Sequence, residues 1–92
     1  MGEYFVDITE KAENDILKIY KSGNKGDINK LNKILVDLSI HPKIGTGNPE
    51  QQLKHNLSGY WSRRINKKDR LIYEIIDEPE NLVVVVSALG HY

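Results

Sequence analysis

The part of the sequence best suited to binding a nucleic acid is residues 53–73, which read LKHNLSGYWSRRINKKDRLIY. It holds six of the 13 Lys and Arg residues, against one acidic residue, Asp69. Aromatic residues lie among these cations. Dense cations suit a phosphate backbone, and aromatic rings between them can stack on bases. The candidate binding residues in and around this stretch are Lys54, His55, Arg63, Arg64, Lys67 and Lys68.

The sequence ends with His91 and Tyr92, which closely follow a strongly apolar run, residues 82–86. Chain ends usually fray and are polar, but this pair closely follows a run typical of a buried strand. We therefore expect the pair to be held in place. A histidine titrates near pH 6.5, which suits general acid or base catalysis at neutral pH. The α-carboxylate of Tyr92 would stabilise an imidazolium beside it, which favours the role of an acid.

Glu50 is the only acidic residue close to the basic stretch on its N-terminal side. It ends a segment with two glycines, an asparagine and a proline, which predicts a loop over residues 45–50. The functional interpretation is a base beside an RNA sugar, and the alternative is an ordinary loop carboxylate. The three histidines show no metal-ligand spacing, so we expect no metal and no cofactor.

The formal net charge of zero hides a strong sorting of charge along the chain. Residues 53–73 carry six cations and one anion, a net charge of +5. Residues 74–80 follow with four acidic side chains and no basic one, a net charge of −4. An overall pI near 6.8 would not indicate a nucleic-acid partner, but the positive electrostatic field around residues 53–73 does.

A length of 92 residues predicts one domain spanning residues 1–92. No apolar run reaches about 18 residues, and the N-terminus lacks the basic start and apolar stretch of a secretory signal. There are no cysteines, which excludes disulfides and fits a reducing compartment. We therefore expect a cytoplasmic protein with no membrane partner.

Two helices are predicted in the first half of the chain, after a short strand at residues 4–8. Thr9 is the expected N-cap of the first helix, whose apolar face recurs every three to four residues from Ala12 to Tyr20. Asp27 is the expected N-cap of the second helix, and His41-Pro42 is expected to end it.

Three strands are predicted in the second half. Residues 59–65 and 71–76 form a hairpin around a short polar connection, and the β-branched run at residues 82–86 predicts a central strand covered on both faces. Strand alternation places Trp61, Arg63 and Ile65 on the expected core face and directs Arg64 away from the helices. The predicted fold class is α+β, with two N-terminal helices packed on one face of a small, mostly antiparallel sheet.

Three segments together resemble the YoeB (Txe/YoeB) toxins of bacterial toxin–antitoxin modules, within the RelE/ParE superfamily. They are LSGYWSRRIN at residues 57–66, RLIY at residues 70–73 and the terminal HY at residues 91–92. The resemblance is strong over residues 43–92, and before them only the order of elements matches.

The resemblance implies a microbial-RNase-like α+β domain that cleaves mRNA in the ribosomal A site and inhibits translation in the bacterial cytoplasm. Its implied catalytic residues are Glu50, Arg70, His91 and Tyr92, and Lys54 and Arg64 match positions that contact RNA or support the site. The reaction it implies needs no metal and forms a 2′,3′-cyclic phosphate. The implied partners are a YefM/Phd-type antitoxin, mRNA on the ribosome, and operator DNA through the antitoxin complex only. A homodimer is a further expected assembly.

The sequence departs from the family pattern at two places. Gln51 and Gln52 stand between Glu50 and Leu53, one residue more than usual. Counting backward from Leu53 would therefore put Gln51 in the catalytic position. Asp69 stands before Arg70, where the family usually has histidine, and adds a negative charge beside the arginine.

Two other functions stay open at this point. One is a ParE-like toxin that binds a protein target without catalysis, against which the terminal His-Tyr pair and the Glu50/Arg70 pair count. The other is a degenerate toxin that acts as an antitoxin-bound co-repressor, for which the additional glutamine is the best support.

Overall fold

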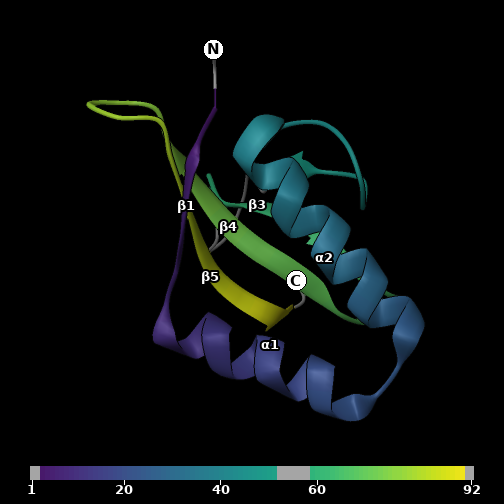
Figure 1. The fold of residues 1–92 in the computed structure, drawn as a ribbon. Helices are drawn as coiled ribbons and strands as arrows, with labels where there is room; N and C mark the ends of the chain where they lie inside the picture. Colours follow the sequence, from purple (N-terminus) through teal and green to yellow (C-terminus); the bar gives the residue numbers. More distant parts are fainter. Residues whose placement is uncertain (1–2, 52–58, 91–92) are drawn as a thin grey trace.

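The computed structural model describes residues 3–51 and 59–90 (Figure 1). Its described elements form one five-stranded sheet with two helices, and the strand order is β1-β5-β4-β3-β2. β1 (Phe5–Ile8) pairs parallel with β5 (Leu82–Gly90), and all other pairs are antiparallel. The remaining strands are β2 (Glu50–Gln51), β3 (Trp61–Arg64) and β4 (Arg70–Ile76). The predicted α+β class with a mostly antiparallel sheet is confirmed.

Helix α1 (Glu10–Ser22) has the N-cap that the sequence predicts, because the side chain of Thr9 accepts a hydrogen bond from the Ala12 N–H at 3.2 Å. Helix α2 (Lys25–Ile40) begins earlier than predicted. Its N-cap is Asn24, whose side chain accepts from the Asp27 N–H at 3.0 Å. The prediction of Asp27 as the cap was therefore wrong. Asp27 lies in the first turn, where its negative charge interacts favourably with the helix dipole.

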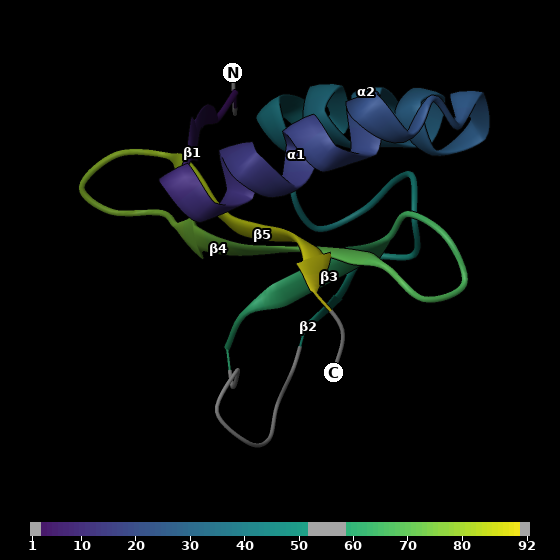
Figure 2. The ribbon, with the colours of Figure 1, turned by 90° about the horizontal axis from the view of Figure 1, so that it is seen from below.

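Both helices lie on the same side of the sheet, as Figure 2 shows. The core forms between this side of the sheet and the helices, and its side chains come from both helices and from the strands. Its fully buried members include Leu31, Ile34 and Leu38 from α2 and Leu71 and Val83 from the strands. The opposite face of β2, β3 and β4 carries no helix in the described part of the chain, and the polar side chains considered below lie there.

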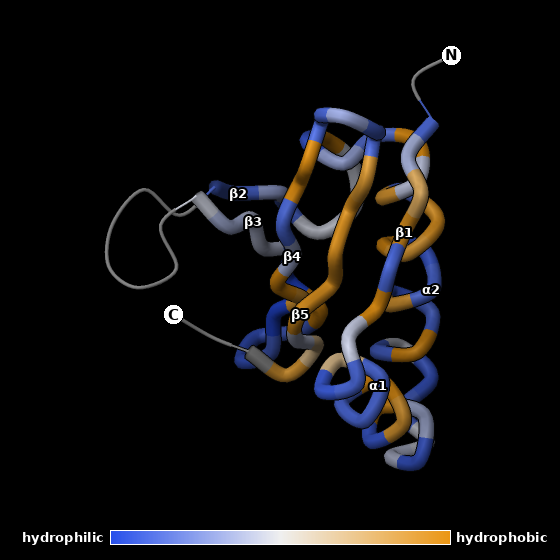
Figure 3. The backbone as a smooth tube through the Cα atoms, turned by 90° about the vertical axis from the view of Figure 1, so that its left-hand side faces the viewer, coloured by the Kyte–Doolittle hydropathy of each residue, from blue (hydrophilic) through white to orange (hydrophobic). Residues whose placement is uncertain are grey.

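β5 is an interior strand, as its β-branched sequence predicts, and it is the longest hydrophobic stretch of the sheet (Figure 3). The expectation that it is covered on both faces was wrong. Val83 and Val85 are fully buried beneath the helices, whereas Val84 and Val86 between them are only half-buried. The reason is that both helices pack on one face only, and within residues 3–51 and 59–90 no second layer covers the other face of β5 (Figure 2).

The carboxyl end of β5 departs from a regular ladder with β4. Tyr73 pairs with Val85 and Arg70 pairs with Gly90, so three steps along β4 correspond to five along β5. Such bulges bend a strand and increase its twist. In Figure 2 the end of β5 accordingly bends away from the helices. This bend brings the last described residue, Gly90, next to Arg70.

Neither helix in the part of the chain described here has the length and apolarity needed to cross a membrane.

Candidate active site

A carboxylate, a guanidinium and a hydroxyl meet on the face of the sheet that the helices leave uncovered. Arg70 on β4 donates to the hydroxyl of Ser62 on β3 at 3.2 Å, and its Nη1 lies 3.5 Å from Glu50 Oε1 on β2. Ser62 is fully buried, the side chain of Arg70 is 18% exposed and that of Glu50 is 60% exposed. The guanidinium of Arg70 is therefore hydrogen-bonded to the buried Ser62 hydroxyl and reaches solvent beside the Glu50 carboxylate.

Strand register explains why these three side chains share a face. Glu50 pairs with Ser62, and Arg64 pairs with Arg70. Residues directly opposite in antiparallel strands point to the same face, and like charges in such pairs repel. The Arg64–Arg70 pair therefore concentrates positive charge on this face, as expected where an anion is to bind.

Glu50 and Gln51, the two residues that the additional glutamine makes candidates for the catalytic position, lie on opposite faces of β2. Glu50 lies on the same face as Arg70, and Gln51 alternates to the other face, where it pairs with Trp61. The amide of Gln51 donates to the Gly59 carbonyl at 3.3 Å. Of the two residues, Glu50 is thus the one that approaches Arg70.

The end of β5 lies beside the same arginine. Gly90, the last described residue, pairs with Arg70. His91 and Tyr92, which the sequence analysis singles out, lie outside the described residues, as do Lys54 and His55.

Arg63 corrects a prediction. It was expected to bind RNA, but its side chain is fully buried on the helix side of the sheet, so it does not belong to the exposed surface. Tyr73, the aromatic residue at the end of the basic stretch 53–73, is also fully buried, and its ring lies 5.7 Å from the Arg63 guanidinium carbon. Both side chains instead support the fold beneath the candidate site.

All five N–H donors of the Arg63 guanidinium have acceptors, most of them in the segment between α2 and β2. The acceptors are the Tyr73 hydroxyl at 3.1 Å, Asp37 Oδ2 at 3.5 Å, and the carbonyls of Thr46 at 3.2 Å, Ile44 at 2.9 Å and His41. The Tyr73 hydroxyl in turn donates to the Pro42 carbonyl at 2.5 Å. Arg63 thereby anchors residues 41–46, which lead directly to Glu50.

Gly47 allows the same segment to lie against β3. The Arg64 N–H donates to the Gly47 carbonyl at 2.7 Å, and Gly47 has a φ of 88°. A Cβ at this position would lie 2.9 Å from the Arg64 carbonyl oxygen. Only glycine fits this approach and this backbone conformation without strain. The glycine segment is therefore structural, and it sets the path of the chain into β2.

Asp37 completes the anchor and carries a perturbed pKa. The Thr46 N–H donates to its carboxylate at 2.9 Å, which holds the pKa of Asp37 below its usual value, and the Arg63 guanidinium acts in the same direction. Partial burial opposes both effects. The carboxylate is thus most stable in its charged form in the folded protein.

This lowered pKa predicts a loss of stability in acid. The folded protein binds a proton at Asp37 less readily than the unfolded chain does. The contribution of Asp37 to the free energy of unfolding is therefore present above the unfolded pKa of about 3.9 and is lost as the pH falls below it. For this quarter-exposed group we expect on the order of 1 kcal/mol. Urea unfolding between pH 2.5 and 7 should show a shallower acid-induced loss in Asp37→Asn than in the wild type, and parallel curves would contradict the prediction.

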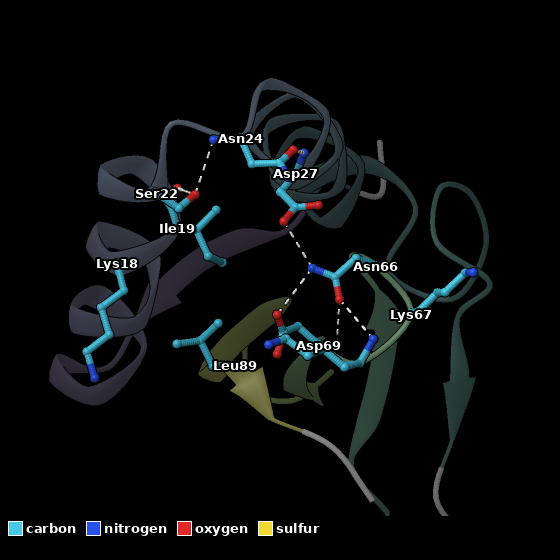
Figure 4. Close-up of a pocket in the computed structure, with 10 residues that line it drawn as sticks. Lys18, Ile19, Ser22, Asn24, Asp27, Asn66, Lys67, Asp69 and Leu89 are labelled. Atoms are coloured by element: carbon cyan, nitrogen blue, oxygen red, sulfur yellow. Dashed lines mark hydrogen bonds between the residues drawn. The ribbon is translucent and has the colours of Figure 1, made fainter.

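The turn between β3 and β4 carries Lys67 and Lys68, which are both exposed. Asn66 orders this turn: its amide donates to Asp27 at 3.0 Å and to Asp69 at 3.1 Å, and its side-chain oxygen accepts from the N–H groups of Lys68 and Asp69 (Figure 4). The Asp69 carboxylate, which the sequence analysis treated as a charge beside Arg70, thus helps to close the turn.

The structure brings together some of the predicted site residues and separates others. Glu50, Arg70 and the exposed Arg64 share one face, the two lysines lie in the adjoining turn, and Arg63 lies beneath the sheet. Ser62 was not predicted from the sequence as a partner of Arg70. It alternates with Arg63 and so lies on the face of Arg64, but only the pairing of β3 with β4 brings it to Arg70.

Within residues 3–51 and 59–90, no three His, Asp or Glu side chains lie close enough together to form a metal-binding group.

Solved structures with the same fold define the class of protein. A YoeB dimer from Staphylococcus aureus has a TM-score of 0.76 and 33% sequence identity, covering 98% of this chain and 99% of that chain. The toxin in a YoeB–YefM complex from the same species has a TM-score of 0.73 and 34% identity, covering 97% and 98%. The fold is that of the small α+β toxins of bacterial toxin–antitoxin systems.

Sequence comparison identifies the family. Toxin YoeB of Escherichia coli O6:H1 is 37% identical over 84 residues, which are 91% of this chain and 94% of that protein. The model of the YoeB-like toxins of bacterial type II toxin–antitoxin systems matches residues 8–92. The chain belongs to this family, which confirms the resemblance found in the sequence.

Proposed function

We propose that this toxin is a ribosome-dependent mRNA endonuclease that cuts in the ribosomal A site and thereby inhibits translation. The observation that carries the proposal is the Glu50–Arg70–Ser62 cluster, which lies on an open, cationic face at the end of β5. It combines a solvent-facing carboxylate with a supported guanidinium, and the last two residues of the chain follow directly from the neighbouring strand.

The proposed chemistry is a transfer reaction at phosphorus that uses no water. Glu50 takes the proton of the ribose 2′-hydroxyl, and the 2′-oxygen attacks the adjacent phosphorus. The bond from phosphorus to the 5′-oxygen breaks, and His91 donates a proton to that oxygen. The products are a 2′,3′-cyclic phosphate and a 5′-hydroxyl. The protein supplies no metal in this scheme.

Arg70 has the role of holding the phosphate. As attack proceeds, negative charge develops on the non-bridging oxygens, and a guanidinium can donate to two of them at once. Ser62 fixes one side of this guanidinium, so the group is oriented before RNA binds. Tyr92 is proposed to stack on a base or to support the acid.

The proposed contacts to RNA and the ribosome surround this cluster. Arg64 lies opposite Arg70 on the same face, and Lys67 and Lys68 extend the positive charge along the turn. Lys54 and His55 are proposed to contribute from the segment between β2 and β3. Arg63 is left out of this set because it is buried.

The proposed partners follow from the family. YoeB forms a complex with YefM in Staphylococcus aureus, and YoeB from that species is also seen as a dimer. We therefore propose a YefM/Phd-type antitoxin as the inhibitor of this toxin, contact with operator DNA through the antitoxin complex, and a homodimer of the free toxin. The proposed location is the cytoplasm, where translated mRNA is found.

Primer extension on a translated mRNA tests the function, with purified ribosomes and protein that carries no C-terminal tag. The wild type should cut within the A site, and both His91→Gln and Glu50→Gln should lose the cut. The cut should also require ribosomes, and its 5′ fragments should end in a cyclic phosphate.

The other outcomes separate the remaining functions. A folded wild-type protein that binds its antitoxin but cuts no mRNA would refute the nuclease and favour a binding toxin or a co-repressor. Cutting that is lost in His91→Gln but retained in Glu50→Gln would remove Glu50 as the base and keep the nuclease.

A further inference from the structure

Asp15 is a buried acidic residue that the proposed chemistry does not use. It lies in α1, on the opposite side of the sheet from Glu50 and Arg70, and is 5% exposed. Its Oδ2 accepts three hydrogen bonds, from Lys11 Nζ at 2.7 Å, the Ala88 N–H at 3.1 Å and the Ser87 hydroxyl at 3.2 Å. Two of these three donors belong to the end of β5.

We propose that Asp15 is a positioning residue that holds the bulged end of β5, and so sets where the C-terminal acid begins; the proposal rests on the proposed function. The acid itself, His91, follows Ala88 by three residues. A chain spans at most about 3.6 Å per residue, so a contact that fixes Ala88 limits the space that His91 can reach.

The bulge explains why a side chain from the helix layer is needed at this place. Ile72 pairs with Ser87 and Arg70 pairs with Gly90, so Ala88 and Leu89 together lie opposite Leu71 alone. A bulge leaves a backbone group outside the regular ladder, and a buried N–H without an acceptor costs about 1–3 kcal/mol. Ala88 is fully buried, and its N–H donates to Asp15. The carboxylate therefore stabilises this bulged backbone.

The electrostatics of Asp15 suit an acceptor that must stay charged. Burial raises the pKa of its carboxyl, but the hydrogen bonds from Lys11 and Ala88 outweigh burial, so its pKa lies below its usual value. The Lys11 side chain is 68% exposed and reaches the carboxylate from one turn earlier in α1. Asp15 is thus an anion with a fixed orientation at neutral pH, as a rigid support requires.

A purely structural role and a positioning role predict different kinetics. If Asp15 only stabilises the fold, Asp15→Asn lowers the melting temperature but leaves cleavage unchanged at temperatures where the variant is folded. If it positions the C-terminus, kcat falls by roughly ten- to a hundredfold with little change in KM, because small displacements of a catalytic group have effects of this size. Asn14→Ala, an exposed neighbour in α1, is the matched control and should match the wild type.

Amide hydrogen exchange of the untagged protein gives a readout that does not depend on cleavage. In Asp15→Asn, exchange at Ala88 and Leu89 should become at least tenfold faster, while Val83 at the other end of β5 stays protected. Faster exchange together with the kcat effect supports the proposal. Unchanged exchange at Ala88, or unchanged kcat in an active enzyme, overturns it. If the wild type cuts no mRNA, the proposed nuclease function is refuted, and so is the role of Asp15 in positioning a catalytic acid. Faster exchange in Asp15→Asn would then show only that Asp15 holds the end of β5.

Discussion

Replacing Arg63 with methionine is expected to lower the free energy of unfolding by about 3–5 kcal/mol, the range typical of a broken buried charge network. Methionine fills much of the same space but donates no hydrogen bond. It would remove the hydrogen bond that Arg63 donates to each of five acceptors, which are three backbone carbonyls in residues 41–46, the Tyr73 hydroxyl and Asp37. Urea unfolding at pH 7 measures this change.

Arg64→Met is the matched control, because it removes the same charge from the next residue of β3, where the side chain is exposed. Exposed substitutions of this kind usually change stability by less than about 0.5 kcal/mol. Arg63→Lys should fall close to Arg63→Met, since a single ammonium cannot serve five acceptors spread around a planar group. Equal stability of Arg63→Met and Arg64→Met would show that the buried network does not matter.

The same substitution should also affect the site. The segment that Arg63 anchors leads to Glu50, so a loosened segment would let the carboxylate leave its place beside Arg70. We therefore expect a folded Arg63 variant to lose cleavage activity at low temperature, although the residue contacts no RNA in our proposal. A study that measured only activity would assign Arg63 to RNA binding, and the stability measurement separates the two roles.

Arg63 also shows where prediction from the sequence stops. Strand alternation placed it on the core face with Trp61 and Ile65, and that geometry was right. It was nevertheless taken as a surface cation, because arginine is almost never fully buried unless it is paired. Its partners are carbonyls of a loop that precedes it by about twenty residues, and no local pattern in the sequence reveals that contact.

The elements with a clear period were predicted well. The apolar faces of both helices, the hairpin of β3 and β4 and the interior place of β5 follow from spacing of three to four residues, alternation and β-branched composition. β2 was missed because a strand of two residues has no period to detect. The N-cap of α2 was misplaced because Asn24 and Asp27 are both good capping residues, and only the loop geometry distinguishes them.

The acidic segment that follows the basic stretch in the sequence lies far from the candidate site in the fold. β4 begins at Arg70 and ends at Ile76, so the acidic turn at residues 77–80 lies at the far end of the β4–β5 hairpin from the candidate site. Seven strand residues span roughly 20 Å, which is more than twice the screening length of about 8 Å at physiological salt. The anionic turn is thus too distant to weaken the attraction of RNA to Arg64 and Arg70.

Replacing Arg70 with alanine is expected to reduce the rate of A-site cleavage by about 10²–10³, the usual effect of removing one preorganised electrostatic stabiliser. The Arg70 guanidinium can neutralise charge on the phosphate, and Ser62 holds it in place. The effect should appear in kcat, because the charge it stabilises develops during the reaction. Single-turnover cleavage on programmed ribosomes measures it.

Two further variants distinguish orientation from charge. Arg70→Lys keeps the cation but loses the fork that can donate to two phosphate oxygens, so we expect it to recover only a small part of the rate. Ser62→Ala keeps the arginine and removes one of its acceptors, and a loss of about tenfold corresponds to one hydrogen bond. Lys21→Ala, which removes an exposed cation from α1, is the control for net charge and should leave cleavage unchanged. If Arg70→Lys were as active as the wild type, the geometry of the guanidinium would be irrelevant and Arg70 would act only through its charge.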